Sequence, residues 1–173
     1  SQITSTLTYD FDKSLSIILE MVSWTSLDCS SLINFTKFGN WFSLSFVTKE
    51  NEKQFPNLVK FISELQSKEV HQAISKMINK DLSNSYVRLE VICDREGFWL
   101  KPHCDIKEKL MSGLIFVNNA NESEDLGTDF YNDKLEKVKT VPYKNNYGYM
   151  FTSGPNTWHG MEKKKILKER RCL

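Results

Sequence analysis

The sequence has almost no net charge, no long apolar run and no leader-like start. Its 23 lysines and arginines are balanced by 22 aspartates and glutamates, so the formal net charge at pH 7 is +1. A nucleic-acid-binding protein draws much of its affinity from a basic excess, so we expect no nucleic-acid partner. No stretch approaches the roughly 18 apolar residues of a membrane span, and residues 1–12 lack the basic and apolar regions of a signal peptide. We therefore expect a cytoplasmic protein with no membrane partner.

Cysteine is also scarce and widely spaced. Cys29, Cys93, Cys104 and Cys172 include no Cys-x-x-Cys pair and form no dense framework. Zinc knuckles and small disulfide-rich domains both depend on such patterns. The cysteines therefore indicate neither class of protein, and a reduced setting is expected.

Glycine and proline are rare in the first half of the chain. Six of the seven glycines and three of the four prolines lie after residue 85. Before that point one stretch, Trp41–Val47, alternates like a strand, and apolar residues elsewhere recur with helical spacing. The predicted helical stripes are Leu15–Val22, Leu58–Leu65 and Val70–Ile78. We predict a single domain, 1–173, in which 1–85 is a mostly helical support region and 86–173 carry the core.

The second half predicts a succession of short strands. The candidates are Tyr86–Ile92, Leu114–Asn118, Thr128–Tyr131, Gly148–Thr152 and Ile166–Leu173. Short strands separated by turns rich in glycine, proline and asparagine are typical of a barrel or a double-sheet jelly roll. The expected fold class is α+β, a jelly roll with N-terminal helices packed on one sheet.

Histidine is the rarest of these residue types, and two of the three histidines lie in chemically informative positions. In a strand His103 and Asp105 face the same side and Cys104 faces the other. His103, Asp105 and His159 together form a 2-His-1-carboxylate set. Such a set leaves coordination positions of the metal open and suits non-haem Fe(II). The alternatives are a surface His-x-Asp pair that binds no metal and a buried structural histidine at 159.

An arginine near the end of the sequence extends this pattern. Arg170 follows His159 by eleven residues, a spacing that allows the chain to return beside the metal ligands. The planar guanidinium pairs bidentately with a carboxylate. The order of these residues therefore predicts a metal site next to a site for a dicarboxylate.

With these residues in this order, the sequence resembles the Fe(II)/2-oxoglutarate-dependent dioxygenases, in particular their small prolyl-hydroxylase-like branch. The motifs that carry the resemblance are PHCD (Pro102–Asp105), GLIFVN (Gly113–Asn118), LGTDFY (Leu126–Tyr131), TWHGM (Thr157–Met161) and ERRCL (Glu169–Leu173). The resemblance covers roughly the C-terminal half of the chain, and it implies a double-stranded β-helix with iron held by His103, Asp105 and His159. It also implies that Arg170, rather than Arg171, binds the far carboxylate of 2-oxoglutarate. The family pattern there is R-x-(small polar), from which Cys172 is a departure.

The activity implied by the resemblance is hydroxylation of a protein side chain or a small molecule. The cofactor would be Fe(II), with 2-oxoglutarate and O2 as co-substrates and ascorbate as an accessory reductant, and the products would include succinate and carbon dioxide. Halogenating relatives have a small residue in place of the carboxylate, so Asp105 favours hydroxylation. A second hypothesis is a catalytically silent metal-binding jelly-roll module that serves as a sensor or scaffold. The acidic turn Glu122–Asp125 is either a cover over the site or an ordinary loop.

Overall fold

The computed structural model describes residues 36–38, 41–45, 56–118 and 121–173. The chain separates into two compact units, one of which contains Val91–Leu173 and the other the residues from Leu44 to Glu90. The helical stripe expected at Leu15–Val22 lies outside the described residues. The expectation of a single domain stays a prediction.

Two helices in the second unit match the two remaining apolar stripes. Helix α2 spans Pro56–Leu65 and buries Leu58 and Phe61, whereas α3 spans Lys68–Ile78 and buries no side chain completely. Proline is well suited to the first position of α2, where its missing N–H has no intrahelical partner to lose. Ser67 caps α3 by accepting a hydrogen bond from a backbone N–H of the first turn. Both helices are as expected, and their packing on a sheet stays a prediction.

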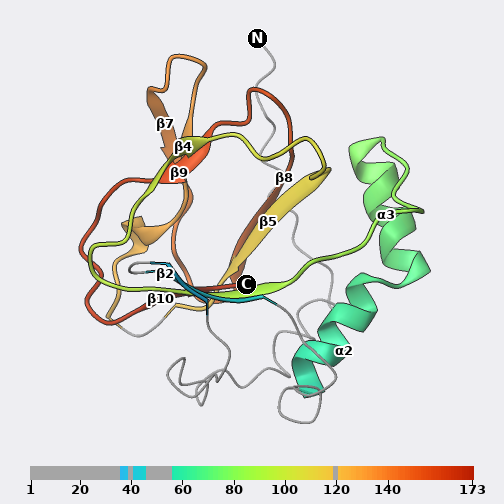
Figure 1. The fold of residues 1–173 in the computed structure, drawn as a ribbon, viewed down its shortest axis with the longest axis horizontal. Coiled ribbons are helices and arrows are strands. Elements are labelled where there is room, and N and C mark those ends of the chain that lie inside the picture. Colours follow the sequence, from blue (N-terminus) through green and yellow to red (C-terminus); the bar gives the residue numbers. More distant parts are fainter. Residues whose placement is uncertain (1–35, 39–40, 46–55, 119–120) are drawn as a thin grey trace. The chain divides into compact units, whose positions relative to one another are not determined.

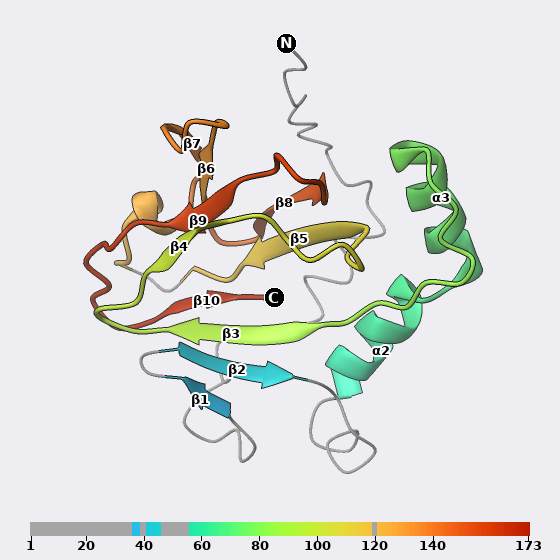
Figure 2. The ribbon, with the colours of Figure 1, turned by 45° about the horizontal axis from the view of Figure 1, so that its top comes forward.

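The strands form two sheets (Figure 1, Figure 2). The six-stranded sheet has the order β1 (Thr36–Phe38), β2 (Trp41–Ser45), β3 (Glu90–Asp94), β10 (Arg170–Cys172), β5 (Met111–Phe116) and β8 (Tyr147–Thr152). The four-stranded sheet has the order β4 (Leu100–His103), β9 (His159–Met161), β6 (Asp129–Tyr131) and β7 (Lys137–Thr140). The strand pairs with an assigned register are antiparallel. The α+β class is therefore confirmed.

From β3 onward the chain passes back and forth between the two sheets. β3, β5, β8 and β10 belong to the larger sheet, and β4, β6, β7 and β9 belong to the smaller one. As a result, β10 lies between β3 and β5, and β9 lies between β4 and β6 (Figure 2). The described strands form two open sheets rather than a closed barrel. This winding brings residues from distant motifs into contact.

The core of the unit that contains Val91–Leu173 is built from both sheets. Its buried residues are Phe116, Leu126, Val141, Tyr143, Tyr149, Met161, Ile166 and Cys172. Phe116 and Tyr149 come from the six-stranded sheet, while Met161 and the half-buried Phe130 come from the other. Burial of such aromatic and aliphatic surface is the main favourable contribution to folding. The core therefore lies between the sheets, next to the strands that carry the predicted site.

Each predicted strand is present, with shifted boundaries. The strand expected at Tyr86–Ile92 begins only at Glu90, where ladder pairing starts, and just before it Arg88 forms an ion pair with Glu90. The sequence analysis did not predict β7 and β9 as separate strands. β7 has a mostly polar sequence, KVKT, and β9 has only three residues, so neither gives a clear alternating pattern.

The described cysteines are not all in the same state. Cys104 and Cys172 carry free thiols, whereas Cys93 is disulfide-bonded. The reduced setting expected from the sequence is therefore not supported at Cys93. Among the described helices, neither α2 nor α3 has the length and apolar character needed to cross a membrane.

Candidate metal centre

Two histidines face each other across neighbouring strands of the smaller sheet. His103 is the last residue of β4 and His159 the first of β9, and the two are direct cross-strand partners. Their ring centroids lie 4.4 Å apart. The next residue, Gly160, allows the close approach, because a Cβ built there would lie 2.6 Å from the carbonyl oxygen of Leu100. These two short strands therefore bring together residues that are far apart in the sequence.

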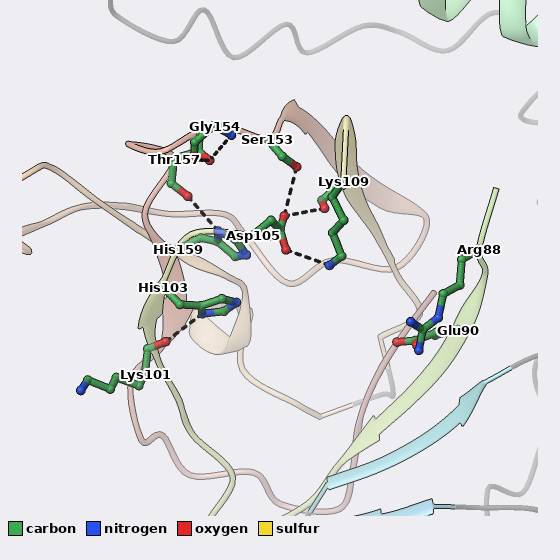
Figure 3. Close-up of polar contacts among 11 residues, drawn as sticks. Arg88, Glu90, Lys101, His103, Asp105, Lys109, Ser153, Gly154, Thr157 and His159 are labelled. Atoms are coloured by element: carbon green, nitrogen blue, oxygen red, sulfur yellow. Dashed lines mark hydrogen bonds and ion pairs between the residues drawn. The ribbon is translucent and has the colours of Figure 1, made fainter. Parts of the chain in front are cut away.

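Backbone carbonyls fix the orientation of both imidazoles. The Nδ1 of His103 lies 2.9 Å from the carbonyl oxygen of Lys101, and the Nδ1 of His159 lies 2.9 Å from that of Thr157 (Figure 3). A carbonyl oxygen only accepts, so each Nδ1 carries the hydrogen and donates it. In the neutral form of each ring Nε2 then keeps a lone pair, and this is the arrangement found in metal-binding histidines whose other nitrogen is anchored.

Burial favours the neutral form of one of these rings. The pKa of His159 is lowered mainly because its ring is buried, and the adjacent imidazole of His103 lowers it further. A protonated imidazole cannot bind a metal ion. His159 is therefore available as a ligand at neutral pH.

Asp105 reaches the histidines from a loop. β4 ends at His103, so the strand alternation expected through Asp105 does not extend that far. Hydrogen bonds position the carboxylate instead (Figure 3): Lys109 Nζ donates to Oδ1 at 2.8 Å, and the hydroxyls of Ser112 and Ser153 donate to Oδ2 at 2.6 and 3.2 Å. Ser112 lies on β5 and Ser153 directly follows β8. The larger sheet thus holds the carboxylate beside histidines carried by the smaller one.

The same contacts keep Asp105 ionised. Its side chain is only 4% exposed, and burial alone would raise the pKa of the carboxyl. The hydrogen bonds from Lys109 and Ser112 outweigh this effect, so the pKa of Asp105 lies below its ordinary value. The cluster accordingly offers two neutral nitrogens and one anionic oxygen.

The three side chains match a metal-binding set. One ligand atom from each of His103, Asp105 and His159 lies within 4.8 Å of the others. Ligands in neighbouring octahedral positions at about 2.1 Å from a shared ion lie about 3 Å apart, so closing on an ion requires each ligand atom to move by about 1 Å at most. Imidazole with carboxylate suits Fe(II) and related divalent metals. Cys104 is not part of the set, and its thiol instead points to the carbonyl oxygen of Pro155, 3.3 Å away.

Arg170 faces the interior, as its alternation with Cys172 predicts. Its side chain is 5% exposed, and Nη1 lies 3.4 Å from the sulfur of Cys172. Arg171 instead donates through Nε to Glu169 and is 21% exposed. Of the two arginines, only Arg170 is thus placed to meet a ligand between the sheets.

The guanidinium of Arg170 already has an anionic partner. Nη1 donates to Oδ2 of Asp94 at 2.5 Å, and Nε donates to the carbonyl oxygen of Leu126 at 2.6 Å. Asp94 is the cross-strand partner of Arg170 on β3 and is completely buried. The sequence analysis did not identify Asp94, because a single aspartate at the end of a strand gives no signal until the strand register is known.

A series of aromatic contacts connects Arg170 with His159 of the candidate metal site. The guanidinium lies 5.4 Å from the ring centroid of Phe116, which lies 5.9 Å from that of Tyr149. Tyr149 stacks on Phe151 at 6.2 Å, and Phe151 packs edge-on against His159 at 4.9 Å. The arginine and the histidines are therefore parts of one continuous packed region between the sheets.

Glu122, in the acidic turn, has a structural position. It is 8% exposed, and its carboxylate accepts backbone N–H groups of Leu167, Lys168 and Glu169 at 3.0, 2.5 and 2.9 Å. These are the residues that lead into β10. Glu122 therefore holds the approach to the strand of Arg170, and of the two interpretations of this turn the ordinary loop fits this residue.

Comparison with known proteins adds no assignment, because no protein-family model and no curated protein matches the chain.

Proposed function

We propose that this protein is an Fe(II)- and 2-oxoglutarate-dependent dioxygenase that hydroxylates a protein side chain or a small molecule. The observation that carries the proposal is the convergence of two anchored histidines and an ionised aspartate on one point. An inward-facing arginine in the same inter-sheet region supplies the second element, a cation for a dicarboxylate.

The strand order supports the fold that this function implies. The orders β3-β10-β5-β8 and β4-β9-β6-β7 arise when a chain winds back and forth between two facing sheets. A double-stranded β-helix is wound in this way. We accordingly propose this jelly roll as the fold of residues 91–173, with the metal ligands on the smaller sheet and its adjoining loop.

The proposed division of labour follows from the contacts. A bound Fe(II) with 2-oxoglutarate and O2 supplies the oxidising chemistry that turns a C–H group into an alcohol, with succinate and carbon dioxide as by-products and ascorbate as an accessory reductant. His103 and His159 hold the metal through Nε2, and Asp105 partly neutralises its charge. Arg170 orients the far carboxylate of 2-oxoglutarate, and the aromatic side chains near it exclude water.

The first experiment tests metal and co-substrate together. Fe(II) and 2-oxoglutarate are added to the full chain without oxygen, and the weak visible band of a 2-oxoglutarate–iron chelate is recorded. Oxygen is then admitted and succinate is measured. We expect a band and succinate formation for the wild type, no band for His103→Ala, and an unchanged band for His71→Ala. His71 lies on α3 and is the remaining histidine of the chain. Absence of the band in the wild type, even with fresh iron and ascorbate, would exclude this function.

The role of Arg170 has a matched control in its neighbour. Arg170→Ala should weaken 2-oxoglutarate binding while iron binding remains, and Arg171→Ala should leave both unchanged. If Arg171→Ala weakens 2-oxoglutarate binding and Arg170→Ala does not, the co-substrate would be assigned to Arg171.

The second candidate is the catalytically silent metal-binding module. The observation that favours it is the ion pair between Arg170 and Asp94, which occupies part of the guanidinium in the absence of any ligand. A chain that binds iron but gives no band with 2-oxoglutarate, and no succinate with a broad panel of peptides and small molecules, would support this alternative.

A further inference from the structure

Arg170 and Asp94 form a buried pair of opposite charges. Asp94 is completely buried and Arg170 is 4% exposed. The titratable described groups near them are Cys172 on the same strand and two phenols, Tyr143 and Tyr149. Burial raises the pKa of the Cys172 thiol to about 12 and raises the pKa of both tyrosines as well. These three groups are neutral near pH 7, so the arginine and the aspartate balance each other alone.

Each member of the pair has unused hydrogen-bonding capacity. Oδ1 of Asp94 is buried and has no hydrogen-bond partner among the described residues. The hydrogen bonds of Arg170 use Nε and Nη1, and no described acceptor is bonded to Nη2. A buried acceptor without a donor is costly, and an unused N–H pair on a buried guanidinium is suited to a carboxylate. Both features indicate an arrangement that is completed by a ligand.

Charge balance limits what that ligand can bring. A carboxylate that binds to Arg170 adds a second negative charge beside Asp94, whereas a single guanidinium neutralises only one. Two carboxylates that share a buried site do not both remain ionised, because their repulsion is hardly screened there. One of the two must then take up a proton from the solvent.

We propose that Asp94 is a ligand-binding residue of the co-substrate site, which takes up one proton on Oδ1 when a carboxylate binds to Arg170 and donates it to that carboxylate as a hydrogen bond. This inference rests on the proposed function, because it takes the far carboxylate of 2-oxoglutarate as the ligand. The proton comes from the solvent, Oδ1 changes from an unpaired acceptor into a donor, and the site returns to a net charge of zero.

The protonation state of the unliganded site is consistent with this exchange. Burial raises the pKa of Asp94 to about 6, although the charge of Arg170 and its hydrogen bond act in the opposite direction. Asp94 is therefore mostly ionised at neutral pH but needs only a small further change to become protonated. A nearby ligand carboxylate, a like charge, acts in that direction.

Proton uptake is measurable on the wild-type protein by calorimetry. The full chain is saturated with Mn(II), which replaces iron without turnover, and is titrated with 2-oxoglutarate at pH 7 in buffers of different ionisation enthalpy. We expect about one proton to be taken up for each molecule bound, and binding to weaken by about tenfold for each pH unit above neutrality. Asp94→Asn, which cannot ionise, should show no uptake and no such pH dependence.

A second buried aspartate provides the control. Asp129 is also completely buried but pairs with Lys164, so Asp129→Asn should keep the proton uptake of the wild type. Binding with no proton uptake by the wild type would overturn the role of Asp94 and leave the proposed function standing. No binding of 2-oxoglutarate to the Mn(II) form would overturn both. The number of protons that the wild type takes up for each molecule of 2-oxoglutarate tests the role of Asp94 even if Asp94→Asn is too unstable to purify.

Discussion

The cluster of His103, Asp105 and His159 and the Arg170–Asp94 pair lie in one aromatic-packed region but differ in how their charges are satisfied. At the cluster, each histidine is anchored at Nδ1 by a backbone carbonyl oxygen, and Asp105 is held in its ionised form. At the pair, a cation and an anion are already in hydrogen-bond contact.

The difference indicates how each region depends on a ligand. The cluster gathers electron-rich atoms that repel one another until a cation binds, so its loss should be detected mainly as a loss of metal binding. The pair is part of the folded protein, since each charge makes the burial of the other tolerable. Its loss should be detected first as a loss of stability.

The largest expected effect concerns the cluster. Removing a residue that only hydrogen-bonds to a metal ligand lowers metal affinity roughly 10- to 100-fold. His159→Ala removes a proposed ligand itself, so it should reduce affinity for Fe(II) or Mn(II) by well over this amount. Anaerobic titration calorimetry measures this loss, and denaturant unfolding should show a much smaller effect. Metal affinity equal to that of His71→Ala would contradict the assignment of His159.

The next effect concerns the pair. Asp94→Ala leaves the charge of Arg170 buried and uncompensated, so the free energy of unfolding should fall by about 3–5 kcal/mol. Replacing both residues, as Asp94→Leu with Arg170→Met, should restore much of that loss. Urea unfolding of the three proteins measures the effect, and equal losses in the single and double variants would argue against a coupled pair.

The pH dependence of stability provides a third comparison. The pKa of Asp94 is about 6 in the folded protein, against an ordinary value of 3.8. The folded state therefore keeps a proton that the unfolded chain releases, and the contribution of Asp94 to the free energy of unfolding should fall by about 3 kcal/mol as the pH rises through this interval. The measurement is the difference between wild type and Asp94→Asn at a series of pH values.

Asp129 should behave in the opposite way. Burial acts to raise its pKa, but the hydrogen bond from Thr140 and the contacts with Lys164 prevail and lower it. The contribution of Asp129 to the free energy of unfolding is therefore present at pH values above the ordinary pKa of an aspartate, and it is lost as the pH falls through the lowered pKa of the folded protein. For each variant, the difference in free energy of unfolding from the wild type is plotted against pH. Slopes of the same sign for Asp94→Asn and Asp129→Asn would contradict the predicted contrast between the two aspartates.

The smallest effect concerns the hydroxyls that position Asp105. Ser112→Ala removes the shorter hydrogen bond to Oδ2, at 2.6 Å, and Ser153→Ala removes the longer one, at 3.2 Å. We expect a loss of about tenfold in metal affinity for Ser112→Ala and a smaller loss for Ser153→Ala. Equal affinities for both variants and the wild type would show that Lys109 alone is sufficient to hold the carboxylate.

Sequence reasoning identified the cluster of His103, Asp105 and His159 because these residue types are rare and their order is distinctive. Only three histidines are present, so two of them in His-x-Asp and Trp-His-Gly motifs form an informative pair. The alternation of Arg170 with Cys172 also identified the inward-facing arginine, and the burial of both agrees with it. These inferences use spacing within one strand or motif, which the sequence contains directly.

The supporting residues were not predictable in the same way. Asp94, Ser153 and Glu122 act through partners between 45 and 76 positions away along the chain. Such contacts depend on strand register and sheet order, which a single sequence does not specify. Lys109 was the exception that a closer reading would have found, because it lies four residues after Asp105.

The position of β10 between β3 and β5 has a consequence for the order in which the protein folds. Both of its neighbours precede it in the chain, and its pairing with β3 joins residues 76 positions apart. During synthesis β3 and β5 therefore emerge with their facing edges unpaired, and such edges invite pairing with other chains. We expect this domain to depend on chaperones until β10 is inserted, and long-range closure of this kind to make its folding slow.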